Sequence, residues 1–163
     1  MDFLEFAKNI EKSGMELYKK LATEISAAEL SGIFRFLAGE EYRHYEIFDA
    51  WQKRIETPDA DSTMVLGEPE ELFKKLAASF DTLGVPAFNY SDAYRKALSF
   101  EHEGLKAYEE ALDGIDEPEQ QQQLQVIIEQ EKIHIRLLTS LLDFNRHPGE
   151  WLENAEVRHS EEY

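Results

Sequence analysis

The sequence contains no cysteine among its 163 residues. This absence excludes disulfide bonds, thiolate metal sites, iron–sulfur clusters and the cysteine motif that attaches haem. Long apolar runs are also missing, because no stretch approaches the roughly 18 apolar residues that a membrane-spanning helix needs. The first residues, MDFLEFAKNIEK, lack the apolar segment of a signal peptide, so we expect a cytoplasmic protein without a membrane span.

Basic residues are scarce relative to acidic ones. The chain has 17 Lys and Arg against 34 Asp and Glu, which gives a formal net charge of −17. Such an excess of negative charge repels phosphate backbones and anionic lipids, and it argues against nucleic acids and membrane surfaces as partners. Bound cations can balance part of this charge. The length fits one domain that buries a substantial core.

Proline and glycine are few, and they separate long helical patterns. Apolar residues recur at helical spacing over residues 2–25, 26–57, 91–113 and 117–145, and no segment has a convincing strand pattern. Short junctions within the first and second pairs predict two antiparallel hairpins. A turn-rich crossover, 58–90, joins the hairpins and contains a short amphipathic helix, EELFKKLAASF. We therefore predict an all-α domain over 1–145 and an acidic tail over 146–163.

The two predicted hairpins are related by an internal repeat at an offset of 90 residues. The repeated ionisable residues lie on the apolar stripes of the helices, where a buried charge needs a compensating partner. Their recurrence in both copies therefore indicates one shared polar site. Asp2, Ala7, Glu11, Gly14, Tyr18, Ile25, Glu29, Glu41 and His44 correspond to Asp92, Ala97, Glu101, Gly104, Tyr108, Ile115, Glu119, Glu131 and His134.

The spacing of the repeated glutamates places them at one level. Glu11 and Glu41 each lie 15 residues from the junction at Ser26, and Glu101 and Glu131 repeat this spacing in the second hairpin. Residues equidistant from the turn of an antiparallel pair stand at the same height, here roughly 22 Å from the turn. The second glutamate of each hairpin is followed three residues later by a histidine, which lies on the same helix face.

Packing the two hairpins about a pseudo-twofold axis brings four glutamates and two histidines together in mid-bundle. Carboxylates combined with imidazoles favour iron, manganese and similar ions over calcium or magnesium. Two divalent cations would balance four carboxylates. Di-iron and di-manganese bundles use this donor set, with one Glu from each of two helices and Glu-x-x-His from each of the others. The predicted metal ligands are Glu11, Glu41, His44, Glu101, Glu131 and His134.

With these motifs, the chain resembles the ferritin-like superfamily, and within it the rubrerythrin-like di-iron domains, over about residues 2–145. The resemblance implies a ferritin-like four-helix bundle that binds two iron ions and forms a homodimer. It implies reduction of hydrogen peroxide, or of dioxygen, with electrons from an external donor protein such as a rubredoxin. It also implies that Glu41 and Glu131 bridge the metals. Tyr18 and Tyr108 would lie beside the site as candidate catalytic residues that hydrogen-bond ligand carboxylates.

The chain departs from close relatives of this type at two positions. Rubrerythrins usually carry a further glutamate where Gly104 stands here, so metal movement that uses this glutamate is not expected. Tyr42 replaces the haem-binding methionine of bacterioferritins, and we expect no haem. A rubredoxin domain is excluded by the lack of cysteine, so the electron donor must be separate. Iron storage with ferroxidase activity and a di-manganese catalase-like centre remain alternatives.

Several neighbours of the predicted site receive no metal-binding role from the sequence. Gly14 and Gly104 face inward, either to leave space for a small oxidant or to allow close helix packing. The remaining acidic neighbours and histidines are interpreted as solvated: Glu16, Glu40, Glu103, His102, His147 and His159.

Overall fold

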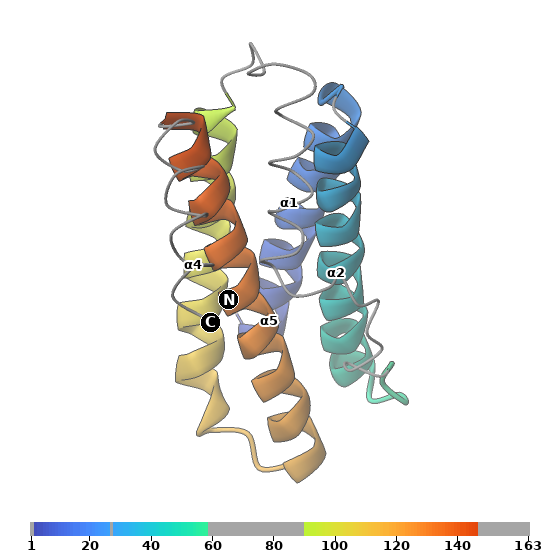
Figure 1. Ribbon diagram of the computed structural model, residues 1–163. Helices are drawn as coiled ribbons and strands as arrows, with labels where there is room; N and C mark the ends of the chain where they lie inside the picture. Colours follow the sequence, from blue (N-terminus) through green and yellow to red (C-terminus); the bar gives the residue numbers. More distant parts are fainter. Residues whose placement is uncertain (1, 27, 59–89, 147–163) are drawn as a thin grey trace, which may run out of the picture.

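The structure, a computed structural model, is an all-α four-helix bundle (Figure 1). It describes residues 2–26, 28–58 and 90–146. α1 packs against α2 and α4 packs against α5 to form two hairpins, and α1 also contacts α4. The predicted fold class is confirmed. The helices are α1, Phe3–Glu24; α2, Ala28–Lys53; α4, Ser91–Leu112; and α5, Pro118–Arg146.

The crossover and the tail are outside this description. Apart from its end residues, the predicted crossover 58–90, with its short helix, lies outside the described residues. The same holds for the predicted tail, 146–163, beyond its first residue. The predicted domain boundaries therefore stay predictions.

The apolar stripes of the helices carry the glutamates into the core. Buried residues recur every three or four positions along α1 and α4, which is the spacing that keeps one helix face against its partners. Because Glu11 and Glu101 belong to these stripes, the packing that buries the apolar side chains also buries both carboxyl groups. The buried residues are Ala7, Glu11, Gly14, Tyr18 and Leu21 in α1, and Ser91, Tyr94, Ala97, Glu101, Gly104 and Tyr108 in α4.

Two hydrophobic clusters fill the core on either side of the glutamates and histidines. Along α2, Leu37 belongs to one cluster and Phe48 to the other, while Glu41 and His44 lie between them. The other three helices repeat this order, with their buried ionisable residues between members of the two clusters. Apolar packing therefore closes the polar middle of the bundle from both ends.

α2 ends earlier than the sequence predicts. The apolar pattern and the following proline suggested a helix to Thr57, but the helix stops at Lys53. Arg54 adopts a left-handed backbone conformation with φ of 55°. The N–H groups of Arg54 and Ile55 donate hydrogen bonds to the carbonyl oxygens of Trp51 and Ala50, at 3.3 and 3.1 Å. This pair of bonds is the Schellman arrangement that closes many helices, and it ends α2 before the proline is reached.

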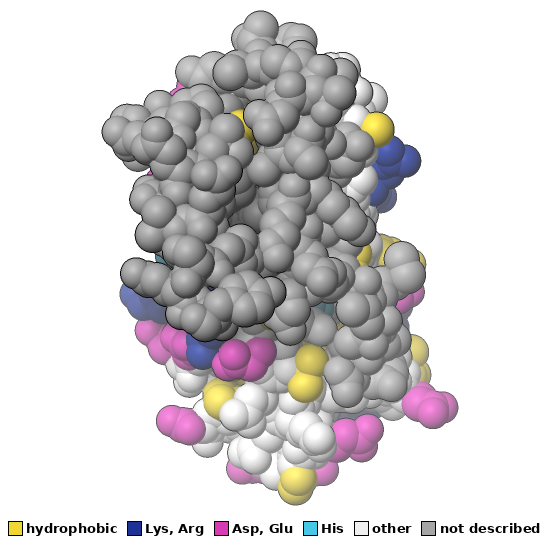
Figure 2. Space-filling model, viewed as in Figure 1, with side chains coloured by type: hydrophobic (Ala, Val, Ile, Leu, Met, Phe, Trp, Pro, Cys, Tyr) yellow, Lys and Arg dark blue, Asp and Glu magenta, His cyan; other side chains and the backbone are white. Residues whose placement is uncertain are grey.

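The described surface is polar and carries many acidic side chains. Figure 2 shows acidic groups spread over the lower part of one face, beside apolar and basic ones. Among the described residues, the exposed large apolar side chains are Tyr42, Ile55 and Ile133. Within residues 2–26, 28–58 and 90–146, no helix combines the length and the apolar character needed to cross a membrane.

Candidate metal centre

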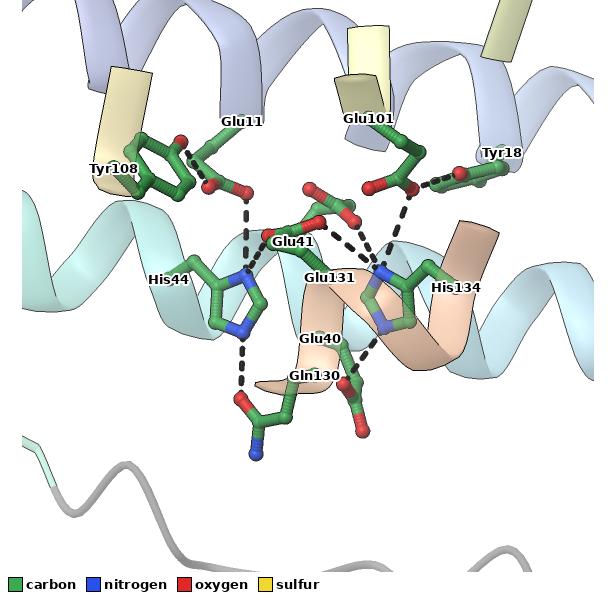
Figure 3. Close-up of polar contacts among 10 residues, drawn as sticks. All are labelled: Glu11, Tyr18, Glu40, Glu41, His44, Glu101, Tyr108, Gln130, Glu131 and His134. Atoms are coloured by element: carbon green, nitrogen blue, oxygen red, sulfur yellow. Dashed lines mark hydrogen bonds and ion pairs between the residues drawn. The ribbon is translucent and has the colours of Figure 1, made fainter. Parts of the chain in front are cut away.

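The structure brings together all six residues that the sequence predicts as metal ligands. They come from all four helices and converge in the middle of the bundle, as Figure 3 shows. Each exposes at most 4% of its surface. Ionisable side chains are almost never buried to this extent without a partner, so the cluster requires a compensating interaction. The six are Glu11, Glu41, His44, Glu101, Glu131 and His134.

The donor atoms of these residues form two overlapping groups. Within each group, one donor atom per residue lies within 4.8 Å of every other. Glu41 and Glu131 belong to both groups, so each can face two positions at once. We call the set Glu11, Glu41, His44 and Glu131 the His44 subsite, and the set Glu41, Glu101, Glu131 and His134 the His134 subsite.

Both histidines turn the same ring nitrogen toward the carboxylates. Nδ1 of His44 lies 2.8 Å from Oε1 of Glu131 and 3.4 Å from Oε2 of Glu11. Nδ1 of His134 lies 3.0 Å from Oε1 of Glu41, and it is also 3.4 Å from a Glu101 oxygen. The two Nδ1 atoms are therefore the nitrogen donors of the subsites, and the Nε2 atoms face away from the centre.

The centre contains buried polar atoms that lie in ion-pair contact with one another but make no well-directed hydrogen bond. Leaving such an atom unsatisfied costs about 1–3 kcal/mol, and native structures rarely do so. Carboxylate oxygens and imidazole nitrogens are common ligands of first-row divalent metal ions. The residues present therefore fit two metal ions. In the described part of the chain, the atoms without a hydrogen-bond partner are Glu11 Oε2, Glu41 Oε1, His44 Nδ1, Glu131 Oε1 and His134 Nδ1.

The pKa values of the buried glutamates and histidines are shifted by burial and by the neighbouring charged groups. Burial raises the pKa of Glu41 well above its usual range, and the neighbouring carboxylates raise it further. Burial, together with Glu131, raises the pKa of Glu101 to about 8. Burial by itself would lower the pKa of His44, but Glu11 and Glu131 hold it well above its usual value. Protons thus balance the carboxylates where no cation does, and two divalent ions would replace them.

Two tyrosines hold the outer glutamates across the bundle. The hydroxyl of Tyr18 donates a hydrogen bond to Oε1 of Glu101, and the hydroxyl of Tyr108 donates one to Oε1 of Glu11, at 2.5 Å. Burial and the nearby carboxylates raise the pKa of both tyrosines well above the usual value. Both hydroxyls therefore remain protonated donors at neutral pH. In Glu11 the bond engages one carboxylate oxygen and leaves the other directed at the centre.

Sequence reasoning missed two residues that contact the outer nitrogens of the histidines. Glu40 was interpreted as solvated, but its side chain is only 13% exposed and its Oε2 lies 2.9 Å from Nε2 of His134. Oε1 of Gln130 lies 2.8 Å from Nε2 of His44. Each of the two immediately precedes the second glutamate of its hairpin. Positions 40 and 130 are related by the 90-residue offset of the repeat, and this match is the sequence signal that could have identified both residues.

The other neighbours behave as the sequence suggests, or lie beyond the description. Glu16, Glu103 and His102 are exposed. His147 and His159 lie outside the described residues.

The two inward-facing glycines have close neighbours of different kinds. A Cβ atom on Gly14 would lie 3.3 Å from Oε2 of Glu41, and one on Gly104 would lie 3.2 Å from Cγ2 of Ile10. Both distances are tighter than ordinary van der Waals contact, so a neighbour would have to move. Close approach of α1 and α4 accounts for Gly104, whereas at Gly14 a Cβ atom would meet a carboxylate of the centre itself.

A four-helix bundle that buries two groups of glutamates and histidines with two carboxylates in common is a di-metal carboxylate protein of ferritin-like architecture. The family model described as Rubrerythrin matches residues 2–142, and the chain belongs to this family. Neither the comparison with curated proteins nor that with solved structures gives a match. The family expected from the repeated motifs is thereby confirmed.

Proposed function

We propose that the protein is a rubrerythrin-like peroxidase, which reduces hydrogen peroxide at a di-iron centre with electrons from a separate donor. The observation that carries this proposal is the pair of buried subsites with Glu41 and Glu131 in common, inside a bundle of the rubrerythrin family. These two glutamates would bridge the metals. Glu11 and His44 would complete one side, and Glu101 and His134 the other.

When bound, two ferrous ions supply the two electrons that, with two protons, convert one hydrogen peroxide into two waters. The four carboxylates match the charge of two divalent ions, so the loaded site is neutral before the oxidant enters. The hydroxyls of Tyr18 and Tyr108 hold the outer glutamates in place while the oxidant binds. The hydrophobic clusters on either side limit the access of bulk water to the centre.

We expect the electrons to come from outside these 163 residues. A rubredoxin domain holds its iron through cysteine thiolates, and this sequence has no cysteine. A separate protein such as a rubredoxin, or a small reductant, would therefore return the centre to its reduced state. We expect no metal movement toward a further glutamate, because Gly104 occupies that position. A Cβ atom there would lie 3.2 Å from Cγ2 of Ile10, so a larger side chain would have to displace Ile10.

Anaerobic stopped-flow oxidation of the Fe(II)-loaded protein tests the reaction. We expect hydrogen peroxide to oxidise the centre much faster than dioxygen at equal concentration, with saturation near one peroxide per two irons. Dioxygen that matches or exceeds peroxide would instead favour an oxidase or ferroxidase. No optical change with either oxidant would show that the six residues do not form a working di-iron centre.

A matched pair of variants on α5 tests the ligand assignment. Glu131→Ala removes a proposed bridging ligand and should abolish the binding of both metals. Glu129→Ala removes an exposed carboxylate from the same helix and should bind metal normally. Peroxidase activity that survives in Glu131→Ala would contradict the assignment.

Two alternatives are separated by simple measurements. Iron storage requires a cage, so a 24-subunit mass in size-exclusion chromatography would support it, whereas the homodimer that we propose excludes it. A di-manganese catalase-like centre would show manganese, not iron, in protein purified from its native cells, and it would produce dioxygen from peroxide without a reductant.

A further inference from the structure

The two subsites contain the same kinds of inner ligand, and they carry chemically different partners just outside them. Each contains Glu41 and Glu131, one outer glutamate held by a tyrosine, and one histidine that presents Nδ1. Beyond the histidines the symmetry ends. Figure 3 shows the carboxylate of Glu40 at Nε2 of His134 and the amide of Gln130 at Nε2 of His44.

The two outer contacts have the same geometry and opposite directions. Glu40 reaches from α2 to the histidine of α5, and Gln130 reaches from α5 to the histidine of α2. The distances are 2.9 Å to His134 and 2.8 Å to His44. Because position and distance are matched, the two outer contacts differ in the chemical nature of the partner.

An ionised carboxylate can only accept hydrogen bonds. At Nε2 of His134 it therefore fixes the ring proton on that nitrogen, and the lone pair of Nδ1 is left for a metal. The negative charge also strengthens the hydrogen bond as the imidazole donates electron density to a cation. Such outer carboxylates raise the basicity of a metal-binding histidine.

An amide offers both a carbonyl oxygen and an NH₂ group. When Gln130 presents its oxygen, His44 has the tautomer that can bind metal through Nδ1. When the amide is turned, its NH₂ group donates to Nε2, and the ring proton moves to Nδ1, where it blocks the metal. Gln130 also carries no charge to strengthen the bond. The ring proton of His44 is therefore held less firmly on Nε2 than that of His134, and Nδ1 of His44 is less consistently free to bind a metal.

We propose that Glu40 and Gln130 are positioning residues that make the two metal positions unequal, so that the His134 subsite binds the first ion and the His44 subsite binds the second, more weakly held ion. Removing an outer partner of this kind lowers metal affinity about 10–100-fold, so the two affinities should differ by about tenfold or more. The inference rests on the proposed two-metal site and not on the identity of the oxidant.

Zinc titration of the full-length apoprotein tests the order directly, with the histidine ring nitrogens observed by ¹⁵N NMR. Zn²⁺ is a suitable probe because it binds carboxylates and imidazoles and has no redox chemistry. At one equivalent, the Nδ1 signal of His134 should shift while that of His44 stays near its apo position. The second equivalent should then shift His44. Filling of His44 first, or of both together, would overturn the inference.

Exchanging the two outer residues provides the decisive comparison. Glu40→Gln should weaken the His134 subsite about 10–100-fold and abolish the order, and Gln130→Glu should strengthen the His44 subsite. The double variant E40Q/Q130E should reverse the order, so that His44 fills first. Glu103→Gln, which removes an exposed charge, is the control for net charge and should leave the order unchanged.

The outcomes separate this inference from the proposed function. An unchanged order in the double variant overturns the inference and leaves the two-metal site standing. Failure of either histidine to respond to zinc overturns both the two-metal site and the inference. If the two subsites fill in this order but the iron-loaded protein does not react with peroxide, the inference is supported and the proposed peroxidase function is contradicted.

Discussion

Tyr18 of α1 donates a hydrogen bond to Glu101 of α4, 83 residues further along the chain. Tyr108 makes the reciprocal bond to Glu11. Each hairpin therefore holds the outer glutamate of the other. Each subsite also includes, from the opposite hairpin, one of the two glutamates that the subsites share. The cluster thus exists only when both hairpins are docked, so bound metals would stabilise the docking of the hairpins.

Removing either tyrosine hydroxyl should weaken the metal centre without unfolding the bundle. Tyr18→Phe and Tyr108→Phe each remove one hydrogen bond to a carboxylate, an interaction that contributes about 1.5–3 kcal/mol. We expect metal affinity to fall about tenfold in each variant, measured by competition with a chelator. Tyr94→Phe, at a buried tyrosine of α4 whose ring stacks on Phe34, is the control and should bind metal normally. Equal affinity in all three variants would contradict the role of the two hydroxyls.

The position of the centre could be predicted from sequence because two independent patterns agree. Each helix has an apolar stripe, and the ionisable residues on the stripes recur at the same offset in both hairpins. A single Glu-x-x-His such as Glu41 and His44 would have been weak evidence. Matched distances from the two turns also placed the residues at one level, and that argument needs only the rise of a helix. The bundle and the cluster therefore follow from periodicity and repetition.

Glu40 and the end of α2 could not be predicted in the same way. Glu40 lies about 100° around the helix from Glu41, which suggests an outward direction when α2 is considered alone. Only the neighbouring α5 turns that position into a contact with His134. The helix end depends on Arg54, which takes a left-handed conformation that the sequence would signal with glycine or asparagine. Both features are set by tertiary context.

The inward-facing glycines provide a second prediction, with one variant acting as control for the other. Gly14→Ala places a Cβ atom 3.3 Å from Oε2 of Glu41, so it should displace a proposed bridging carboxylate. Gly104→Ala places its Cβ atom 3.2 Å from a side-chain carbon of Ile10 and disturbs packing instead. Both gain helix propensity of about 1 kcal/mol. We expect metal affinity, measured by calorimetry, to fall more in Gly14→Ala. Equal losses would show that Glu41 adjusts freely.

Arg54 provides a prediction about stability that leaves the metal centre untouched. A residue with a Cβ atom costs about 1–2 kcal/mol in the left-handed conformation, and glycine avoids this cost at some loss of unfolded-state entropy. Arg54→Gly should therefore stabilise the apoprotein by about 0.5–1 kcal/mol in urea unfolding. Lys53→Gly, one position earlier and inside the helix, should destabilise it by a similar amount. Stabilisation by both variants, or by neither, would contradict the role of Arg54 as the residue that ends α2.

The last prediction concerns the pH dependence of the apoprotein. Burial raises the pKa of Glu101 from 4.5 to about 8, and it raises that of Glu41 well above 4.5. The folded state therefore keeps protons that the unfolded state releases as the pH rises. Nearby carboxylates, against the effect of burial, raise the pKa of His44 and His134 well above 6.5. Their stabilising contribution is complete below pH 6.5 and is lost as the pH rises through the folded-state pKa.

The buried glutamates with raised pKa values and the two histidines therefore both make the folded apoprotein less stable as the pH rises above 5. Burial alone would raise the pKa of Glu11, but the charge of His44 and hydrogen bonds with its neighbours, including Tyr108, together lower it. Its stabilising contribution is therefore present above pH 4.5 and does not oppose the trend. Unfolding free energy of the apoprotein should fall between pH 5.5 and 8, by up to about 1.4 kcal/mol per pH unit for each proton retained. Cobalt loading should stabilise the protein more at pH 8 than at pH 5.5, because protons compete with the metal for the same atoms. Glu41→Gln removes one buried carboxyl group, and its apoprotein should show a flatter profile. Stability that rises with pH in the unmodified apoprotein would contradict the crowded, proton-balanced cluster on which the metal centre is built.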